Sequence, residues 1–242
     1  MTKDVWLATH PYLQPVADWH RLVEAAAAEV GVPVAPVPVW DDYLDDFAAG
    51  VPLLESSTVA VDLSVPQGAV RSLIRRLASS PLPGTLAQQC RALAAELETS
   101  ESRSPAHAGL YRYLGCVVLV RHLCDVVSAF DGWRDEDQWL RNYCPTCGEP
   151  PAMAQLVGQD PGRLRKLSCG LCRSRWRYRR TGCPFCDGQN EHRLAVVAVE
   201  GQGGLRIDYC EACGGSRWLS GGRDWLCDTT SRLSAVPRAS WS

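Results

Sequence analysis

The sequence lacks a long apolar run. Its most apolar stretch, Leu114–Val120, is followed directly by Arg121 and His122, whereas a membrane-spanning helix needs about 20 consecutive apolar residues. The first residues, Met1–Trp6, also lack the positive start and apolar core of a secretory signal peptide. We therefore expect a cytoplasmic protein without a membrane span, in a compartment where thiols stay reduced.

Catalytic motifs are also absent. The sequence contains no nucleophile elbow, no paired-histidine helix motif and no phosphate-binding loop. Its histidines have no metal-ligand spacing and stand at positions His10, His20, His107, His122 and His192. We therefore expect a protein that is not an enzyme.

Charge is distributed unevenly, although the net charge of the chain is only −2. Residues 1–143 carry 11 Lys and Arg against 18 Asp and Glu, whereas residues 144–242 carry 14 against 9. Such a change of composition is typical of a domain boundary. It predicts that one domain ends near residue 140.

The first part of the chain has helical patterns. Residues 15–30 are alanine-rich and precede Gly31, which predicts a helix that ends there. Apolar residues return at helical spacing in residues 66–79 and 84–99, and residues 105–130 are apolar enough for one long central helix. We expect residues 1–140 to form an all-helical bundle.

Cysteine is the most informative residue type. Eight of the twelve cysteines form four C-x-x-C pairs: Cys144/Cys147, Cys169/Cys172, Cys183/Cys186 and Cys210/Cys213. The first two pairs are separated by 21 residues and the last two by 23. A two-residue spacing lets a tight turn aim both thiolates at one point, and a hairpin brings the second pair to complete a tetrahedron. We expect two metal ions, zinc or iron, each with four cysteine ligands.

An internal repeat of about 40 residues surrounds these pairs. Each half has a cysteine pair, a hairpin, a second pair and a short strand with tryptophan. The expected strands cover residues 153–157, 163–167, 175–179, 194–199, 205–209 and 217–219, with turns at 159–162 and 201–204. The repeat predicts ribbon domains at residues 141–181 and 182–242, and it favours a first metal site from the first two pairs over an interleaved arrangement.

Other roles for the paired cysteines fit the sequence less well. Disulfides do not suit a reduced compartment, and thioredoxin-type dithiol catalysis needs a helix that starts at the pair, where hairpin strands are expected here. The sequence does not distinguish a metal with a purely structural role from one that takes part in the function. Cys90, Cys116 and Cys124 lie among Leu and Val on helical faces, so we expect buried free thiols; Cys227 is isolated.

A basic strand follows the second cysteine pair. No acidic residue occurs between Asp160 and Asp187, and Arg173, Arg175, Arg177, Arg179 and Arg180 fall within this interval. On a strand, the odd-numbered arginines would share one face, opposite Trp176 and Tyr178. This face is either a binding surface for a partner or nucleic acid, or a solvated face whose arginines pair with the acidic helical half.

The cysteine-rich part resembles a known family. The stretches CPTCGEPP from Cys144, LSCGLCRSRWRYRRTGCPFC from Leu167, and RIDYCEAC from Arg206 are similar to the formate dehydrogenase accessory protein (FdhE) family. The resemblance implies an α+β fold in which an N-terminal helical bundle precedes two tandem rubredoxin-like, or zinc-ribbon, β-hairpin modules.

The resemblance also implies a function. It indicates a cytoplasmic maturation chaperone that binds the catalytic subunit of formate dehydrogenase, or of a related molybdenum or tungsten oxidoreductase. The eight paired cysteines would hold the metals, and the arginines from Arg173 to Arg180 are the candidate client-binding residues. Two alternatives remain, a nucleic-acid-binding zinc ribbon and a rubredoxin-like redox sensor or electron carrier.

Overall fold

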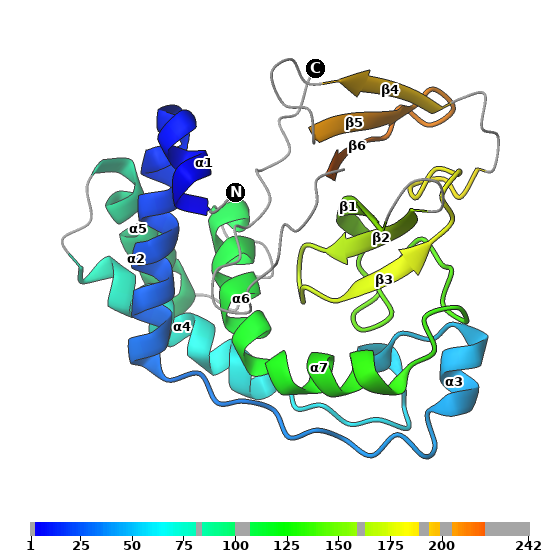
Figure 1. Cartoon of the computed structure of the whole chain (residues 1–242). Coiled ribbons are helices and arrows are strands. Elements are labelled where there is room, and N and C mark those ends of the chain that lie inside the picture. The colour runs from blue at the N-terminus through cyan, green and yellow to red at the C-terminus, as the bar shows by residue number, and fades with distance from the viewer. Residues whose placement is uncertain are drawn as a thin grey trace. The chain divides into compact units, whose positions relative to one another are not determined.

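The chain forms two compact units, shown in Figure 1. The computed structural model describes residues 3–80, 84–99, 107–158, 163–188, 194–198 and 205–220. The first unit comprises Met1–Val37 and Val61–Val126, and the second comprises Pro38–Ala60 and Val127–Ser242. Helices precede two antiparallel hairpin modules, so the expected α+β fold class is confirmed.

The first unit is a helical bundle. Its α-helices are α1 (Lys3–Thr9), α2 (Gln14–Val30), α4 (Ser64–Ala78), α5 (Gly84–Thr99) and α6 (Ala108–His122), and a 3₁₀ turn, η1 (Pro11–Leu13), precedes α2. Helix α4 packs against α2, α5 and α6. The predicted face of α4 is buried there, with Leu73 and Ile74 at its centre and Leu93 of α5 beside them. Each such side chain contributes about 1.5–3 kcal/mol when buried.

Helix α2 ends where the sequence predicts. Gly31 has φ +67°, a left-handed conformation that glycine adopts without steric cost. The chain then runs without regular structure through residues 32–40. Buried His122 fastens this connector, because its Nδ1 lies 2.7 Å from the Pro33 carbonyl oxygen and its Nε2 lies 3.0 Å from that of Asp62. His122 therefore has a structural role.

The expected single helix over residues 105–130 is wrong. The chain forms two helices, α6 and α7 (Cys124–Trp133), which are separated by Leu123 with φ −95° and ψ 4°. Neither proline nor glycine stands at the break, so the apolar pattern of residues 105–130 could not reveal where the helix ends. Among the described residues no single helix has the length and apolarity to cross a membrane, while α6 and α7 meet those criteria only when counted together as a bent pair.

Strands dominate the second unit. They are β1 (Pro151–Val157), β2 (Leu164–Cys169), β3 (Arg175–Tyr178), β4 (Leu194–Ala198), β5 (Leu205–Cys210) and β6 (Ser216–Ser220). The sheet order is β3-β2-β1-β6-β5-β4, and every pair is antiparallel except β1 and β6. The predicted strands are thus confirmed within one or two residues. The predicted turns at 159–162 and 201–204 lie outside the described residues.

The segment Pro38–Ala60 joins the second unit although it comes from the predicted helical half. It contains α3 (Leu44–Ala49) and a 3₁₀ turn, η2 (Leu53–Glu55). The backbone N–H groups of Leu53 and Leu54 donate to the carbonyl oxygens of Pro145 and Thr146, at 2.9 and 2.8 Å. This segment therefore braces the first cysteine turn.

An aromatic cluster continues this contact. Phe47 of α3 stacks on Trp139 with 5.2 Å between ring centroids, and it meets Phe130 of α7 edge-on at 6.0 Å. Fully buried Tyr43 packs against both Phe47 and Phe130. Part of the chain before residue 140 therefore belongs to the second unit by its contacts. The domain boundaries at residues 140 and 181 concern independent folding and remain predictions.

Candidate metal centres

The first cysteine group consists of Cys144 and Cys147, which precede β1, and Cys169 and Cys172 at the end of β2. Their four sulfur atoms all lie within 4.8 Å of one another. The Sγ–Sγ distance is 3.5 Å for Cys144 and Cys172, and also for Cys147 and Cys169. A tetrahedral metal with bonds of about 2.3 Å would separate its sulfurs by about 3.8 Å, whereas a disulfide requires about 2.05 Å. The group fits a four-thiolate metal site.

The turns that carry these cysteines have a shared backbone geometry. The N–H of Thr146 donates to Cys144 Sγ at 3.4 Å, and the N–H of Leu171 donates to Cys169 Sγ at 3.2 Å. After the second cysteine of every pair the chain adopts a positive φ, at Gly148 (73°), Arg173 (68°), Asp187 (53°) and Gly214 (68°). This left-handed step redirects the chain so that both sulfurs of a pair face the same point.

We expect Gly148→Ala to destabilise the second unit by about 1–2 kcal/mol, because a side chain is strained at positive φ. An added Cβ would also lie 2.3 Å from Glu55 Oε1. Gly68→Ala is the matched control: Gly68 lies in α4 with open space around it, and alanine should stabilise that helix by about 0.5–1 kcal/mol. Thermal denaturation followed by circular dichroism measures both, and a shift of the same sign in the two variants would contradict the left-handed requirement.

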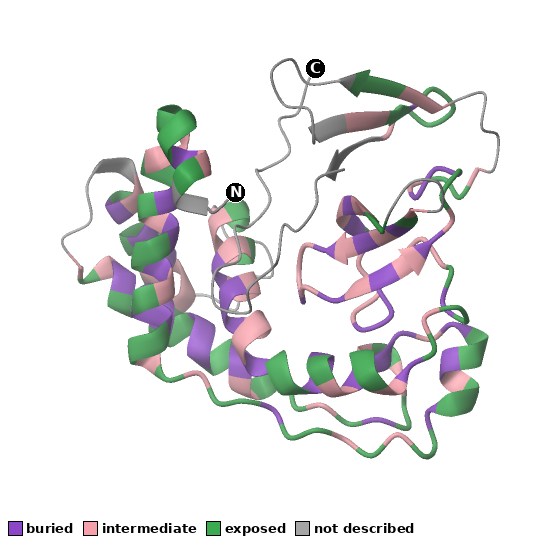
Figure 2. Cartoon of the chain, in the orientation of Figure 1, coloured by how far each residue is buried: buried purple, intermediate pink, exposed green. Residues whose placement is uncertain are grey.

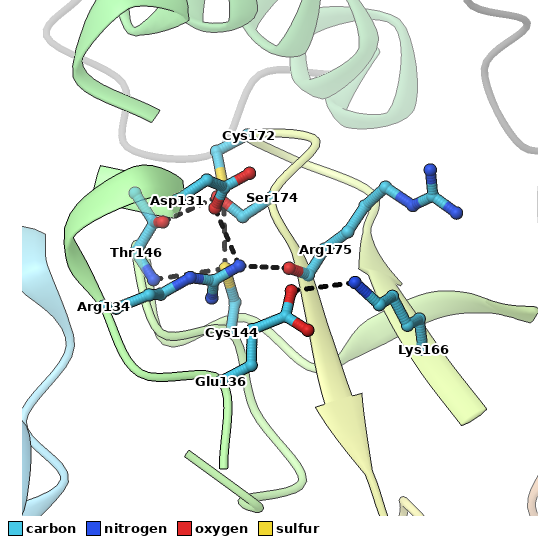
Figure 3. A network of polar contacts seen from close by, with 9 residues as sticks. All are labelled: Asp131, Arg134, Glu136, Cys144, Thr146, Lys166, Cys172, Ser174 and Arg175. Atoms are coloured by element: carbon cyan, nitrogen blue, oxygen red, sulfur yellow. Dashed lines mark hydrogen bonds and ion pairs between the residues drawn. The ribbon is translucent and has the colours of Figure 1, made fainter. Parts of the chain in front are cut away.

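Two buried hydroxyl groups support the first cysteine group, as Figure 3 shows. Thr146 Oγ1 lies 2.6 Å from Ser174 Oγ, which in turn lies 3.3 Å from Cys172 Sγ. Both hydroxyl residues are fully buried. If Cys172 were a metal-bound thiolate, it could only accept, so the Ser174 hydroxyl would donate to Cys172 and accept from Thr146.

Metal binding at this group would release protons. Burial raises the pKa of the Cys144 and Cys172 thiols. Hydrogen bonds from the three neighbouring thiols, those of Cys144, Cys147 and Cys172, lower the pKa of Cys169. A divalent metal bound by these four cysteines would displace the protons that their thiols still carry.

A polar network ties the end of α7 to the ribbon (Figure 3). Buried Arg134 pairs with Asp131 at 2.7 Å and donates to the backbone carbonyl oxygen of Arg175 on β3. Lys166 of β2 pairs with Glu136 at 2.8 Å. These contacts hold the outer edge of the ribbon sheet.

The second cysteine group consists of Cys183, Cys186, Cys210 and Cys213, whose sulfur atoms also lie within 4.8 Å of one another. The Sγ–Sγ distance is 3.6 Å for Cys183 and Cys213 and 4.0 Å for Cys186 and Cys210. Cys183 and Cys210 are buried, but Cys186 and Cys213 are exposed. The cysteines thus gather in the two groups that the repeat favours, not in the interleaved arrangement, and the two groups differ in exposure.

The basic strand has the predicted alternation. Trp176 and Tyr178 are buried, and the arginines between and beside them are half-buried, as Figure 2 shows for β3. Arg173, in contrast, lies in the cysteine turn before β3 and not on the strand. Arg180 follows the strand and is exposed.

The arginines of this strand have partners within the second unit. Arg175 donates to Gln155 Oε1, Arg177 pairs with Asp137, and Arg179 lies 3.5 Å from Asp187. Asp137 belongs to the acidic first part of the chain, as the paired-arginine interpretation expects, whereas Gln155 is neutral and Asp187 lies in the basic part. A partner-binding role for Arg173, Arg175, Arg177, Arg179 and Arg180 stays a prediction.

Arg165 has a role that the sequence did not single out. It is only 2% exposed, and its guanidinium donates to the Gly182 carbonyl oxygen at 2.9 Å and lies 3.5 Å from Asp208 Oδ2 of β5. It therefore links the two ribbons. On β2, Arg165 shares its strand face with buried Leu167 and Cys169. This two-residue alternation was the signal for a buried arginine that the sequence offered.

The remaining cysteines match the expectation of buried thiols only in part. Cys90 is buried as predicted, and burial raises its pKa; Cys116 is half-buried. The prediction of a buried thiol is wrong for Cys124, which is exposed because it begins α7, where the chain leaves the bundle core. Cys227 and His192 lie outside the described residues.

Comparisons with known proteins agree on one family. Residues 143–180 match the family model described as FdhE, central domain. The FdhE homolog of Shewanella oneidensis is 37% identical over 114 residues, which cover 47% of this chain and 37% of that protein. The homolog of Shewanella baltica is 32% identical over the same length. The matched region thus spans little more than a third of these relatives.

A solved structure extends the likeness. The crystal structure of the FdhE protein from Pseudomonas aeruginosa has a TM-score of 0.54 and 26% sequence identity, and the match covers 87% of this chain and 76% of that one. The family match contains the whole first cysteine group, and the structural match covers most of the chain. The cysteine-rich part of this chain is therefore similar to the FdhE central domain, and the fold of the chain is similar to that of an FdhE protein.

Proposed function

We propose that this protein is a non-enzymatic accessory protein that binds the catalytic subunit of formate dehydrogenase, or of a related molybdenum or tungsten oxidoreductase, in the cytoplasm and supports its assembly. The observation that carries the proposal is the first cysteine group, which is preformed within the stretch that matches the FdhE central domain. The absence of a recognisable catalytic motif from the sequence is consistent with an accessory role.

In this proposal each cysteine group holds one metal ion, zinc or iron. Cys144, Cys147, Cys169 and Cys172 hold the first, and Cys183, Cys186, Cys210 and Cys213 hold the second. When bound, the metal supplies a four-way crosslink between two cysteine turns, and binding free energy becomes folding free energy for a module too small to bury its own core. The sulfur separations of 3.5–4.0 Å support this assignment.

The nucleic-acid alternative requires unpaired arginines on β3. Arg177 and Arg179 already have the acidic partners Asp137 and Asp187. Phosphate binding would break these ion pairs, and their loss would offset part of the binding free energy gained from the phosphate. These contacts support the accessory role over a phosphate-binding face.

Deletion of the gene should abolish most formate dehydrogenase activity in cell extracts, and the intact gene supplied on a plasmid should restore it. An immunoblot for the catalytic subunit separates failed assembly from failed synthesis. Normal activity in the deletion strain would refute the assembly role.

Metal analysis of protein purified without air tests the sites separately. We expect about two equivalents of zinc or iron per chain. A visible absorption spectrum distinguishes the metals, because ferric thiolate sites absorb visible light and zinc sites do not. Fewer than one equivalent would contradict the two-site assignment.

A further inference from the structure

A pocket of about 370 Å³ lies within the second unit, away from both cysteine groups. Trp40, Phe47 and Trp133 form its aromatic wall, and Asp41 and Asp135 add carboxylates. Concave sites with aromatic walls and a few polar groups are typical binding sites for small groups.

The aromatic wall is held in place by packing. The Trp40 and Trp133 ring centroids lie 5.8 Å apart at an interplanar angle of 33°, and Phe47 meets Trp133 at 5.6 Å and 74°. Phe130 packs against both tryptophans, at 5.6 and 5.9 Å. A wall whose rings are already fixed loses little conformational entropy when a ligand binds.

The charge of the pocket is negative. Asp135 is oriented by the N–H of Asp137 at 2.9 Å and by Gln138 Nε2 at 3.2 Å. Residues 38–60, which supply Asp41, contain five Asp and Glu and no Lys or Arg. Carboxylates beside tryptophan faces favour a cation, since both the charges and the ring quadrupoles attract it.

The same aromatic cluster already holds two guanidinium groups. Arg134 lies over the Phe130 ring at 5.6 Å, and Arg141 lies over the Trp139 ring at 5.6 Å. Within the described part of the chain, no cation lies over Trp40 or Trp133. The rings of Trp40 and Trp133 at the pocket could therefore bind a guanidinium group in the way that Phe130 and Trp139 do.

We propose that this pocket binds an arginine side chain from an extended peptide segment of a protein partner. The occupant is a peptide and not a free amine, because apolar side chains are available for its flanking residues. Leu44 lines the pocket and is 57% exposed, and Val39, which precedes Trp40 in the chain, is 74% exposed. Arginine suits the site because its planar guanidinium stacks on aromatic rings and forms hydrogen bonds to carboxylates at its edge. This binding does not depend on the proposed function in assembly.

Titration of the metal-loaded chain with the peptide acetyl-Leu-Arg-Leu-amide tests the proposal. The readout is the indole N–H resonances of Trp40 and Trp133 in NMR spectra. We expect saturable shifts, and binding about tenfold weaker or more for the citrulline peptide, which has the same shape without the charge. Free arginine amide should also bind more weakly because it lacks the leucines.

Charge variants locate the site. Asp41→Asn should weaken binding about threefold and the double variant with Asp135→Asn about tenfold, whereas Asp45→Asn should leave it within about 1.5-fold. Asp45 is the matched control, because it lies on α3, is exposed and does not line the pocket. The absence of saturable binding, equal binding of the citrulline peptide or of arginine amide, or equal effects of the Asp41 and Asp45 variants would overturn the proposal.

Discussion

Replacement of Cys169 by serine is expected to lower the metal content from about two equivalents to about one and to unfold the first ribbon. Cys169 is 2% exposed, and its sulfur lies among the three other sulfurs of the first group. Serine cannot supply a soft thiolate ligand. Its hydroxyl would be buried among three sulfur atoms, and burial of a polar group costs free energy unless it forms a hydrogen bond. For small zinc peptides the metal contributes about 10–16 kcal/mol of binding free energy at neutral pH, so the loss should exceed the stability of a module of this size.

Metal analysis and circular dichroism measure this effect. Cys124→Ser is the matched control, because Cys124 is an exposed free thiol outside both groups. That variant should keep both metals and the stability of the parent chain. The helical signal of the first unit should persist in Cys169→Ser, since its core of Val23, Leu73, Leu93 and neighbouring residues contains none of the ligands. Two equivalents of metal in Cys169→Ser would refute the assignment of the first group.

Local patterns were enough to predict the ribbons. The C-x-x-C pairs identified the eight cysteines, and the repeat grouped them as the structure does. Gly148 and Gly214 follow the first and the fourth cysteine pair, and both have positive φ. Arg173 and Asp187 take the same conformation without being glycine. The turn is therefore set by hydrogen bonds to sulfur and by closure of the group more than by residue preference.

Packing partners could not be predicted in the same way. Helical periodicity shows which face of a helix is buried, but it does not show what covers that face. Phe47 and Phe130 were therefore assigned to a helical bundle, although they pack with Trp139 beside the first ribbon. Aromatic residues concentrated at 40–47 and 130–143 were the available signal for this cluster. The pocket beside it follows from that long-range contact and was not foreseen.

Chelation is expected to remove the metal of the second group at least about tenfold faster than that of the first. A chelator must displace thiolates one after another, and Cys186 and Cys213 are exposed to it. In the first group three cysteines are buried and Cys147 is half-buried, so attack requires local opening of the turn. An opening free energy of about 1.4 kcal/mol already slows the reaction tenfold. A coloured chelator such as 4-(2-pyridylazo)resorcinol, added to the zinc form, should show two phases of equal amplitude.

Variants assign the two phases. Cys213→Ser should remove the fast phase and leave the slow one unchanged, and a fast phase that survives this change would contradict the assignment. Ser174→Ala should accelerate only the slow phase, because it removes the hydroxyl that lies 3.3 Å from Cys172 Sγ and leaves Thr146 without its buried partner. Loss of one such buried hydrogen bond costs about 1–3 kcal/mol, which corresponds to about fivefold or more in the opening equilibrium. Because both groups offer four thiolates, we expect the burial of the sulfurs, and not the ligand type, to set the rate of metal loss in each ribbon.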